Sequence, residues 1–177
     1  MHIREAKKTE LKDVLAVESA AFDSVEEAEL VNDLLHDPSA EPVLNLLAFE
    51  NDRAVGHILF TRARLEPESS ESVALLAPLA VVPDSQGKGI GGQLIRHGLK
   101  CLSESGVDIV FVLGHPGYYP RHGFTPAGKH GYNAPYPIPE KDSDAWMFQR
   151  LNQTETGNYT GTVTVAEKLR KPEYWRE

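Results

Sequence analysis

The residues from Leu79 to Gly92, which read LAVVPDSQGKGIGG, join an apolar run to a loop that holds four glycines. Glycines let backbone N–H groups approach a phosphate closely, and Lys88 adds a positive charge beside them. A helix that begins in this loop directs its free N–H groups and the positive end of its dipole to the same point. This pattern favours the binding of a pyrophosphate group, because a strand–helix turn without a ligand needs far fewer glycines.

Two other phosphate-binding motifs fit the loop less well. A P-loop needs a serine or threonine after its lysine to hold magnesium, whereas Lys88 is followed by a glycine. The glycines of Gly87–Gly92 also match a dinucleotide fingerprint, but that motif places its first glycine almost directly after the strand. Here Pro83–Gln86 intervene, and the acid of the next strand, Asp108, lies at the wrong end of that strand.

The elements that must position this loop follow from the apolar periodicity of the chain. We expect strands at 2–6, 43–50, 53–65, 72–82, 107–113, 145–151 and 159–165, and helices between Thr9 and Phe22, between Ser24 and Leu35, and over Lys88–Ser105. Ser24 and Glu27 have the spacing of a capping box, and Pro78 predicts a bulge or a lost ladder hydrogen bond within its strand. Residues 128–144 are expected to form an ordered loop, and 166–177 a tail.

Strands that alternate with helices in the middle of the chain, and follow one another elsewhere, predict a mixed α/β sheet with helices on its faces. We expect residues 1–151 to form one domain, and residues 152–177 a C-terminal extension with a last strand and a tail.

Two motifs in register give the chain a family resemblance. Gln86, Gly89 and Gly91 match the pattern [QR]-x-x-G-x-[GA] after a strand that ends in LAV, and Tyr119 stands four residues before the pair Gly123-Phe124. These motifs and the order of the predicted elements resemble those of the GNAT acyltransferases. The amino-acid sequence around the motifs resembles the YhbS-like branch of bacterial N-acetyltransferases. The resemblance covers about residues 1–151 and is strongest over 75–124.

The resemblance implies a mostly antiparallel sheet in which two central parallel strands splay apart, with helices on both faces. It implies an N-acetyltransferase that moves the acetyl group of acetyl-CoA to a primary amine by direct attack in a ternary complex. No cluster of residues in the sequence has metal-ligand spacing, so we expect no metal. The pantetheine arm would pair with the backbone of Leu79, Ala80 and Val81. The pyrophosphate would lie on the loop made of Gln86, Gly87, Lys88, Gly89, Ile90, Gly91 and Gly92.

Tyr119 is the candidate general acid for the leaving thiolate, since a tyrosine with a pKa of roughly 10 stays protonated at neutral pH. The alternative is a tyrosine that only packs, which is how we interpret its neighbour Tyr118. A backbone N–H near Leu79–Ala80 is the implied donor to the oxyanion.

The general base is harder to predict. In the family it is often a carboxylate on the strand before the loop, and Glu71 at the start of that strand is the candidate. His115, His122 and His130 are alternatives near the expected cleft. Cys101 is expected to be a small buried apolar side chain rather than a nucleophile.

The acceptor would contact the helix pair near Phe22–Leu35 and the loop 128–144, where Tyr132 and Tyr136 could line an entrance. Acidic residues at the start of the second helix could attract a cation, or they could form a solvated face; these are Glu26, Glu27 and Glu29. Two other functions stay open. The chain could be a non-catalytic sensor or scaffold that binds acyl-CoA, or a nucleotide-binding protein that uses the same loop.

Composition restricts the partners. A net charge of −8, from 18 basic and 26 acidic residues, argues against non-specific binding to nucleic acid. The single cysteine excludes an intramolecular disulfide, and the sequence shows neither a signal peptide nor an apolar run long enough for a membrane span. We therefore expect a cytoplasmic protein, as a monomer or a homodimer.

Overall fold

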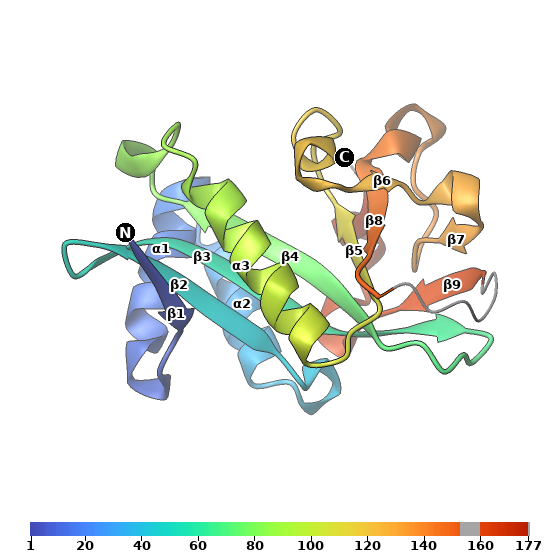
Figure 1. The fold of residues 1–177 in the computed structure, drawn as a ribbon, viewed down its shortest axis with the longest axis horizontal. Coiled ribbons are helices and arrows are strands. Elements are labelled where there is room, and N and C mark those ends of the chain that lie inside the picture. Colours follow the sequence, from blue (N-terminus) through green and yellow to red (C-terminus); the bar gives the residue numbers. More distant parts are fainter. Residues whose placement is uncertain (153–159, 177) are drawn as a thin grey trace.

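A twisted sheet forms the centre of the molecule in the computed structural model, which describes residues 1–152 and 160–176 (Figure 1). Within these residues the sheet has nine strands, with β1 to β6 and β8 in the order β1-β2-β3-β4-β5-β8-β6, while β9 pairs with β3 and β7 pairs with β9. The strands are β1 (His2–Glu5), β2 (Leu44–Glu50), β3 (Arg53–Glu66), β4 (Val73–Val81), β5 (Ile109–Leu113), β6 (Thr125–Pro126), β7 (Tyr132–Asn133), β8 (Trp146–Arg150) and β9 (Gly161–Thr164). The pairs β4–β5 and β7–β9 are parallel, and the others are antiparallel.

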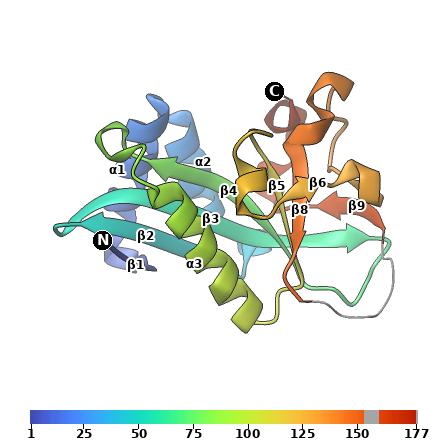
Figure 2. The same ribbon diagram turned by 45° about the horizontal axis from the view of Figure 1, so that its top comes forward.

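Helices cover both faces of the sheet. The helices α1 (Leu11–Phe22) and α2 (Glu26–Leu35) lie on one face, and α3 (Ile90–Glu104) lies on the other (Figure 2). The prediction of a mixed α/β sheet is confirmed. None of the helices in the described part of the chain combines the length and the apolar composition that a membrane crossing needs.

Consecutive apolar residues of a strand pack alternately against the helices on the two faces of the sheet, because successive side chains of a strand point to opposite sides. The layer under α1 and α2 includes Val14, Val31, Leu34, Leu47, Leu59 and Leu75. The layer under α3 includes Leu46, Ile58, Phe60, Leu76, Leu94 and Ile95. This explains why the central strands read as continuous apolar runs rather than as alternating ones.

Gly98 lets α3 lie close to the sheet, because a Cβ added there would be 2.3 Å from Cε2 of the buried Phe60 ring. Alanine is favoured over glycine within a helix by about 1 kcal/mol, but overpacking a core costs about 1–3 kcal/mol. We expect Gly98→Ala to lower the free energy of unfolding, measured by urea denaturation. In a Phe60→Leu background the same substitution should cost less, and an equal cost in both backgrounds would contradict this packing argument.

The start of α2 differs from the predicted capping box. Ser24 does accept the Glu26 N–H through its Oγ, at 3.1 Å. Glu27 does not return a bond, and its buried Oε2 has no hydrogen-bond partner among the described residues. The Glu27 side chain, which the sequence predicts to cap α2, instead lies near Glu18 of α1, where its charge raises the pKa of Glu18.

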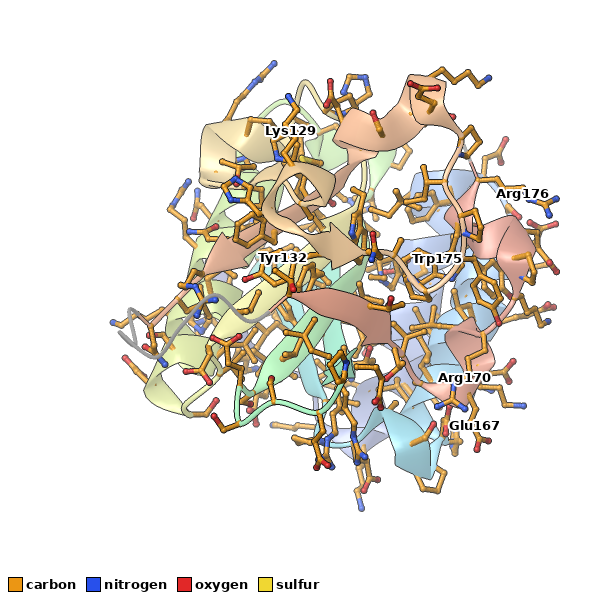
Figure 3. All side chains as sticks on the ribbon, turned by 90° about the vertical axis from the view of Figure 1, so that its right-hand side faces the viewer. Lys129, Tyr132, Glu167, Arg170, Trp175 and Arg176 are labelled. Carbon is orange, nitrogen blue, oxygen red and sulfur yellow. The ribbon has the colours of Figure 1, made fainter. Side chains whose placement is uncertain are left out.

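The C-terminal residues pack against the core and do not form the free tail that we predicted. Leu169 and Trp175 are 3% and 2% exposed, and the Trp175 indole N–H donates to the Leu169 carbonyl at 3.0 Å (Figure 3). The Trp175 ring also meets the Trp146 ring edge-on, with 5.7 Å between the ring centroids. Burial of the apolar side chains of Leu169 and Trp175 explains why this segment packs against the core.

The last strand is confirmed as β9, which pairs with the distal end of β3. The predicted connection over residues 153–158, and Tyr159 at the start of the predicted strand, lie outside the described residues. The short strands β6 and β7 fall in a region where no strand was predicted. Each has only two residues, too few for a recognisable alternation.

Candidate active site

The parallel strands β4 and β5 pair over only part of their length. The register joins Val73–Leu76 to Ile109–Val112, and β5 then turns away with β8 (Figure 1). Beyond Leu76, β4 stays paired with β3 alone, and the register between β3 and β4 shifts next to Pro78. Proline cannot donate to a ladder, so the irregularity predicted at Pro78 is confirmed and it coincides with the point where the two strands separate.

The edge of β4 that β5 leaves free carries the backbone groups of alternate residues. The Val82 N–H donates to the Val55 carbonyl at 2.9 Å, and in an antiparallel ladder such pairs alternate with pairs that do not exchange bonds. The N–H and C=O of Ala80 therefore point to β3, while those of Leu79 and Val81 point to the free edge. Gln86 Nε2 donates to the Val81 carbonyl at 3.0 Å, which holds the following loop against this edge.

The glycine loop leads directly into α3. Gly87 and Gly89 have φ of +78° and +82°, the left-handed region that favours glycine, and Gly89 is the N-cap of α3. No side chain caps the first turn, so its N–H groups are available to an anion. In the part of the chain that the structure describes, a Cβ added at Gly87 or Gly89 would meet no atom within 4 Å, so the space before the loop is open there.

Two other predicted loop residues take different roles. The Ile90 side chain is 4% exposed and belongs to the core under α3, so only its backbone is available to a ligand. Lys88 is mostly exposed, with Nζ 3.9 Å from Glu50 Oε1, and this loose contact leaves its charge free to turn to a phosphate.

Tyr118 reaches the first turn of α3. A Cβ added at Gly91 would lie 2.5 Å from the Tyr118 hydroxyl oxygen and 3.7 Å from a methyl group of Leu79. A Cβ at Gly92 would lie 2.7 Å from the His122 ring, which contacts Tyr118 edge-on. The sequence interpretation treated Tyr118 as packing only. The position of Tyr118 could have been predicted from Gly91 and Gly92, because two glycines in the first turn of a helix leave room for side chains from another segment.

Tyr119 lies just beyond the end of β5. Its ring covers Gly114, where an added Cβ would be 2.3 Å from the ring, and it meets the Phe124 ring edge-on. Burial raises the pKa of the Tyr119 hydroxyl above its ordinary value, and Tyr118 adds to the shift. Tyr119 is therefore protonated at neutral pH, as a general acid must be. Burial, followed by the charges of Arg96 and Arg121, lowers the pKa of His122.

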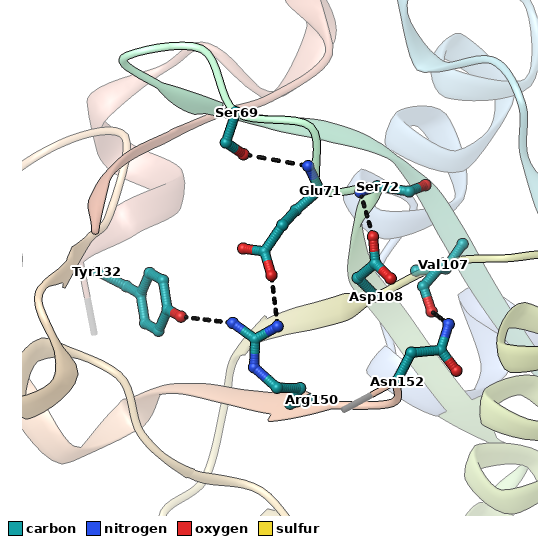
Figure 4. A network of polar contacts seen from close by, with 8 residues as sticks. All are labelled: Ser69, Glu71, Ser72, Val107, Asp108, Tyr132, Arg150 and Asn152. Atoms are coloured by element: carbon teal, nitrogen blue, oxygen red, sulfur yellow. Dashed lines mark hydrogen bonds and ion pairs between the residues drawn. The ribbon is translucent and has the colours of Figure 1, made fainter. Parts of the chain in front are cut away.

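Glu71 is not brought together with Tyr119. It stands two residues before Val73, which pairs with the first residue of β5, whereas Tyr119 follows the last. Its carboxylate forms an ion pair with Arg150, whose other nitrogen donates to the Tyr132 hydroxyl at 3.0 Å (Figure 4). The geometry thus gives Glu71 a contact that ties β4 to β8, and it does not favour the predicted role as base.

This ion pair carries a prediction for stability. The Glu71 side chain is 4% exposed, so Glu71→Gln leaves Arg150 without its charge partner and should lower the free energy of unfolding by about 1–3 kcal/mol. Urea denaturation measures this, and Glu68→Gln in the same loop, which is exposed, is the matched control. Equal stability of the two variants would contradict the structural role, and a turnover number that falls without loss of stability would restore Glu71 as a base candidate.

The remaining candidates lie apart from one another. His115 is exposed and accepts the Gly117 N–H, and His130 packs on Phe148. Tyr132 is a core residue against Phe111, so it lines no entrance.

Burial raises the pKa of the Cys101 thiol, as expected for a small apolar side chain. In residues 1–152 and 160–176, no group of three or more histidine, cysteine, aspartate or glutamate side chains could hold a metal ion.

Comparisons with known proteins agree with this geometry. Residues 2–127 match the model of the acetyltransferase (GNAT) domain. The chain is 51% identical over 162 residues to the uncharacterised N-acetyltransferase YjhQ of Escherichia coli K12, which covers 90% of this chain and 89% of that protein.

Two solved structures have the same fold. The Escherichia coli GNAT-family N-acetyltransferase YhbS in complex with CoA superposes with a TM-score of 0.86 at 29% identity, covering 96% of this chain and 92% of YhbS. A Brucella melitensis GNAT-family acetyltransferase in complex with acetyl-CoA superposes with a TM-score of 0.75 at 27% identity, covering 95% and 97%. The predicted resemblance is confirmed, and the chain belongs to the GNAT family of N-acetyltransferases.

Proposed function

We propose that this protein transfers the acetyl group of acetyl-CoA to a primary amine by direct attack in a ternary complex. The observation that carries the proposal is the free edge of β4 at Leu79 and Val81, which leads into the open glycine loop at the start of α3. Two relatives of the same fold bind CoA and acetyl-CoA. An extended pantetheine arm fits such an edge, because the edge offers backbone groups that β5 does not pair, although Gln86 already binds the Val81 carbonyl.

Each residue of the site has one task in this reaction. The first-turn N–H groups of α3 and Lys88 bind the pyrophosphate. The Leu79 N–H, on the free edge, donates to the thioester oxygen as it becomes an oxyanion. Tyr119 donates its proton to the sulfur as the C–S bond breaks.

The atoms balance without another reactant. The neutral amine nitrogen forms the new C–N bond, the sulfur leaves with the C–S electrons, and Tyr119 protonates it. The acylated nitrogen then releases a proton, which restores Tyr119, so that amide and free thiol are the products.

The test is a measurement of acetyl-CoA binding by calorimetry and of thiol release with a panel of primary amines. We expect binding, together with thiol release that depends on the amine. Absence of binding at millimolar acetyl-CoA would overturn the proposal. Binding without release on any amine would instead favour a non-catalytic sensor or scaffold of acyl-CoA.

A further inference from the structure

A buried polar cluster lies under the sheet, and the chemistry described above does not use it. Glu18 of α1 and His57 of β3 are both 0% exposed, and Glu18 Oε2 is 2.5 Å from His57 Nδ1. The other ring nitrogen of His57, Nε2, is 2.6 Å from Oδ1 of Asn45 on β2. Three elements thus contribute to one chain of hydrogen bonds in an otherwise apolar layer.

Two carboxylate oxygens at this cluster have no partner. Glu18 Oε1 and Glu27 Oε2 are buried, and neither has a hydrogen-bond partner among residues 1–152 and 160–176. Buried polar atoms are paired in the great majority of cases, and a carboxylate oxygen left unpaired is costly. Glu18 is fully buried, whereas Glu27 is only partly buried, and Glu27 lies near enough for its charge to raise the pKa of Glu18.

The cluster lies beside the predicted reaction centre. His57 is the cross-strand partner of Ala80, so the two side chains share the face of the sheet that α1 and α2 cover. Leu79, whose N–H points to the free edge, is the next residue of the same strand. The Leu79 side chain points to the opposite face, near Gly91 of α3. The Glu18 carboxylate, hydrogen-bonded to His57, therefore lies on the face that α1 and α2 cover, one residue along β4 from the N–H predicted to face the thioester.

We propose that Glu18 and Glu27 bind the ammonium group of a cationic primary amine, and that Glu18, held by His57, accepts its proton. This inference rests on the proposed function and names its acceptor site and base. An ammonium group has three N–H donors and one positive charge, which suits two unpaired carboxylate oxygens. The nitrogen would lie between Glu18 Oε1 and Glu27 Oε2.

The charges around Glu18 agree with this role. The titratable groups that face it are Glu27 from α2 and His57 from β3, while β2 and β4 present the neutral Asn45 and Ala80. Burial raises the pKa of Glu18, the hydrogen bond and charge of His57 oppose the shift, and the charge of Glu27 adds to it. A carboxylate with a raised pKa is a better proton acceptor than an ordinary one.

The proton balance needs no further reactant. The ammonium transfers one proton to Glu18 and becomes the neutral nucleophile. The C–N bond then forms and the C–S bond breaks as described above. The proton on Glu18 returns to solvent after the amide leaves.

The experiment compares two acceptors in variants of the full-length chain. An alkylamine is charged at neutral pH and must lose a proton, whereas an alkoxyamine is already neutral. We expect Glu27→Gln and Glu18→Gln to lower kcat/KM for the alkylamine about 100-fold at neutral pH, and to lower it little for the alkoxyamine. The loss with the alkylamine should shrink as the pH approaches its own pKa of roughly 10.

The matched control is Asp33→Asn, which likewise replaces a carboxylate by its amide at an exposed position of α2 and should change neither acceptor's rate. Equal losses on both acceptors, or an unchanged alkylamine rate in Glu27→Gln, would overturn this inference while the proposed function stands. Glu27→Gln is informative even where Glu18→Gln fails to fold, because Glu27 is only partly buried. A wild type that acetylates no amine would overturn the proposed function, and the inference with it.

Discussion

Gly89→Glu is expected to abolish acetyl-CoA binding while the protein stays folded. A side chain at this position would enter the open space before the first turn of α3, where no atom lies within 4 Å of the added Cβ. A carboxylate about 4 Å from a phosphate charge costs about 4 kcal/mol at an effective dielectric constant of about 20. This corresponds to a loss of affinity of about 1000-fold, measured as the Kd by calorimetry.

The same helix supplies the control. Gly106 follows the other end of α3, with φ of +92° and, among the described residues, no atom within 4 Å of an added Cβ. Gly106→Glu therefore carries the same left-handed strain, about 1–2 kcal/mol, without a phosphate in reach. We expect both variants to lose similar stability and only Gly89→Glu to lose binding. Equal losses of affinity would mean that strain alone explains the effect and would contradict the phosphate site.

The backbone geometry of the proposed donor site could be predicted from the sequence because its determinants are local. The backbone conformation of Gly87 and Gly89, the end of β4 and the start of α3 lie within one short segment. Pro78 likewise predicted where the β3–β4 ladder is irregular, since a proline has no backbone N–H to donate. One feature could not be predicted from the sequence: the backbone N–H of Leu79, rather than that of Ala80, points to the free edge. This follows only from the register of β4 with β3.

The proposed acceptor site could not be predicted from the sequence because its residues come from separate elements. Glu18 and His57 are 39 residues apart and meet only when α1 packs on β3. In the sequence, Glu18 is one of two acids on α1, and nothing there distinguishes it, while Glu27 has the spacing of a cap. The sequence also could not show that Glu71 lies apart from Tyr119, since that depends on which ends of β4 and β5 lie together.

Tyr119→Phe is expected to lower kcat about 100-fold and to leave the Kd for acetyl-CoA unchanged. The substitution removes only the hydroxyl, so the ring still covers Gly114 and packs against Phe124. The adjacent Tyr118→Phe is the matched control. Its hydroxyl lies by Gly91 and Leu79, along the predicted path of the cofactor, so its loss should raise the Kd for acetyl-CoA more than it lowers kcat.

The pH dependence of kcat is a second test of a tyrosine as the general acid. A general acid must be protonated to act, and burial raises the pKa of Tyr119, so its protonated form persists to higher pH. We therefore expect no fall in wild-type kcat from loss of this proton below about pH 10, the ordinary tyrosine value. A fall of kcat in Tyr118→Phe with Tyr119→Phe unaffected would transfer the role of acid to Tyr118, since burial raises the pKa of that hydroxyl as well.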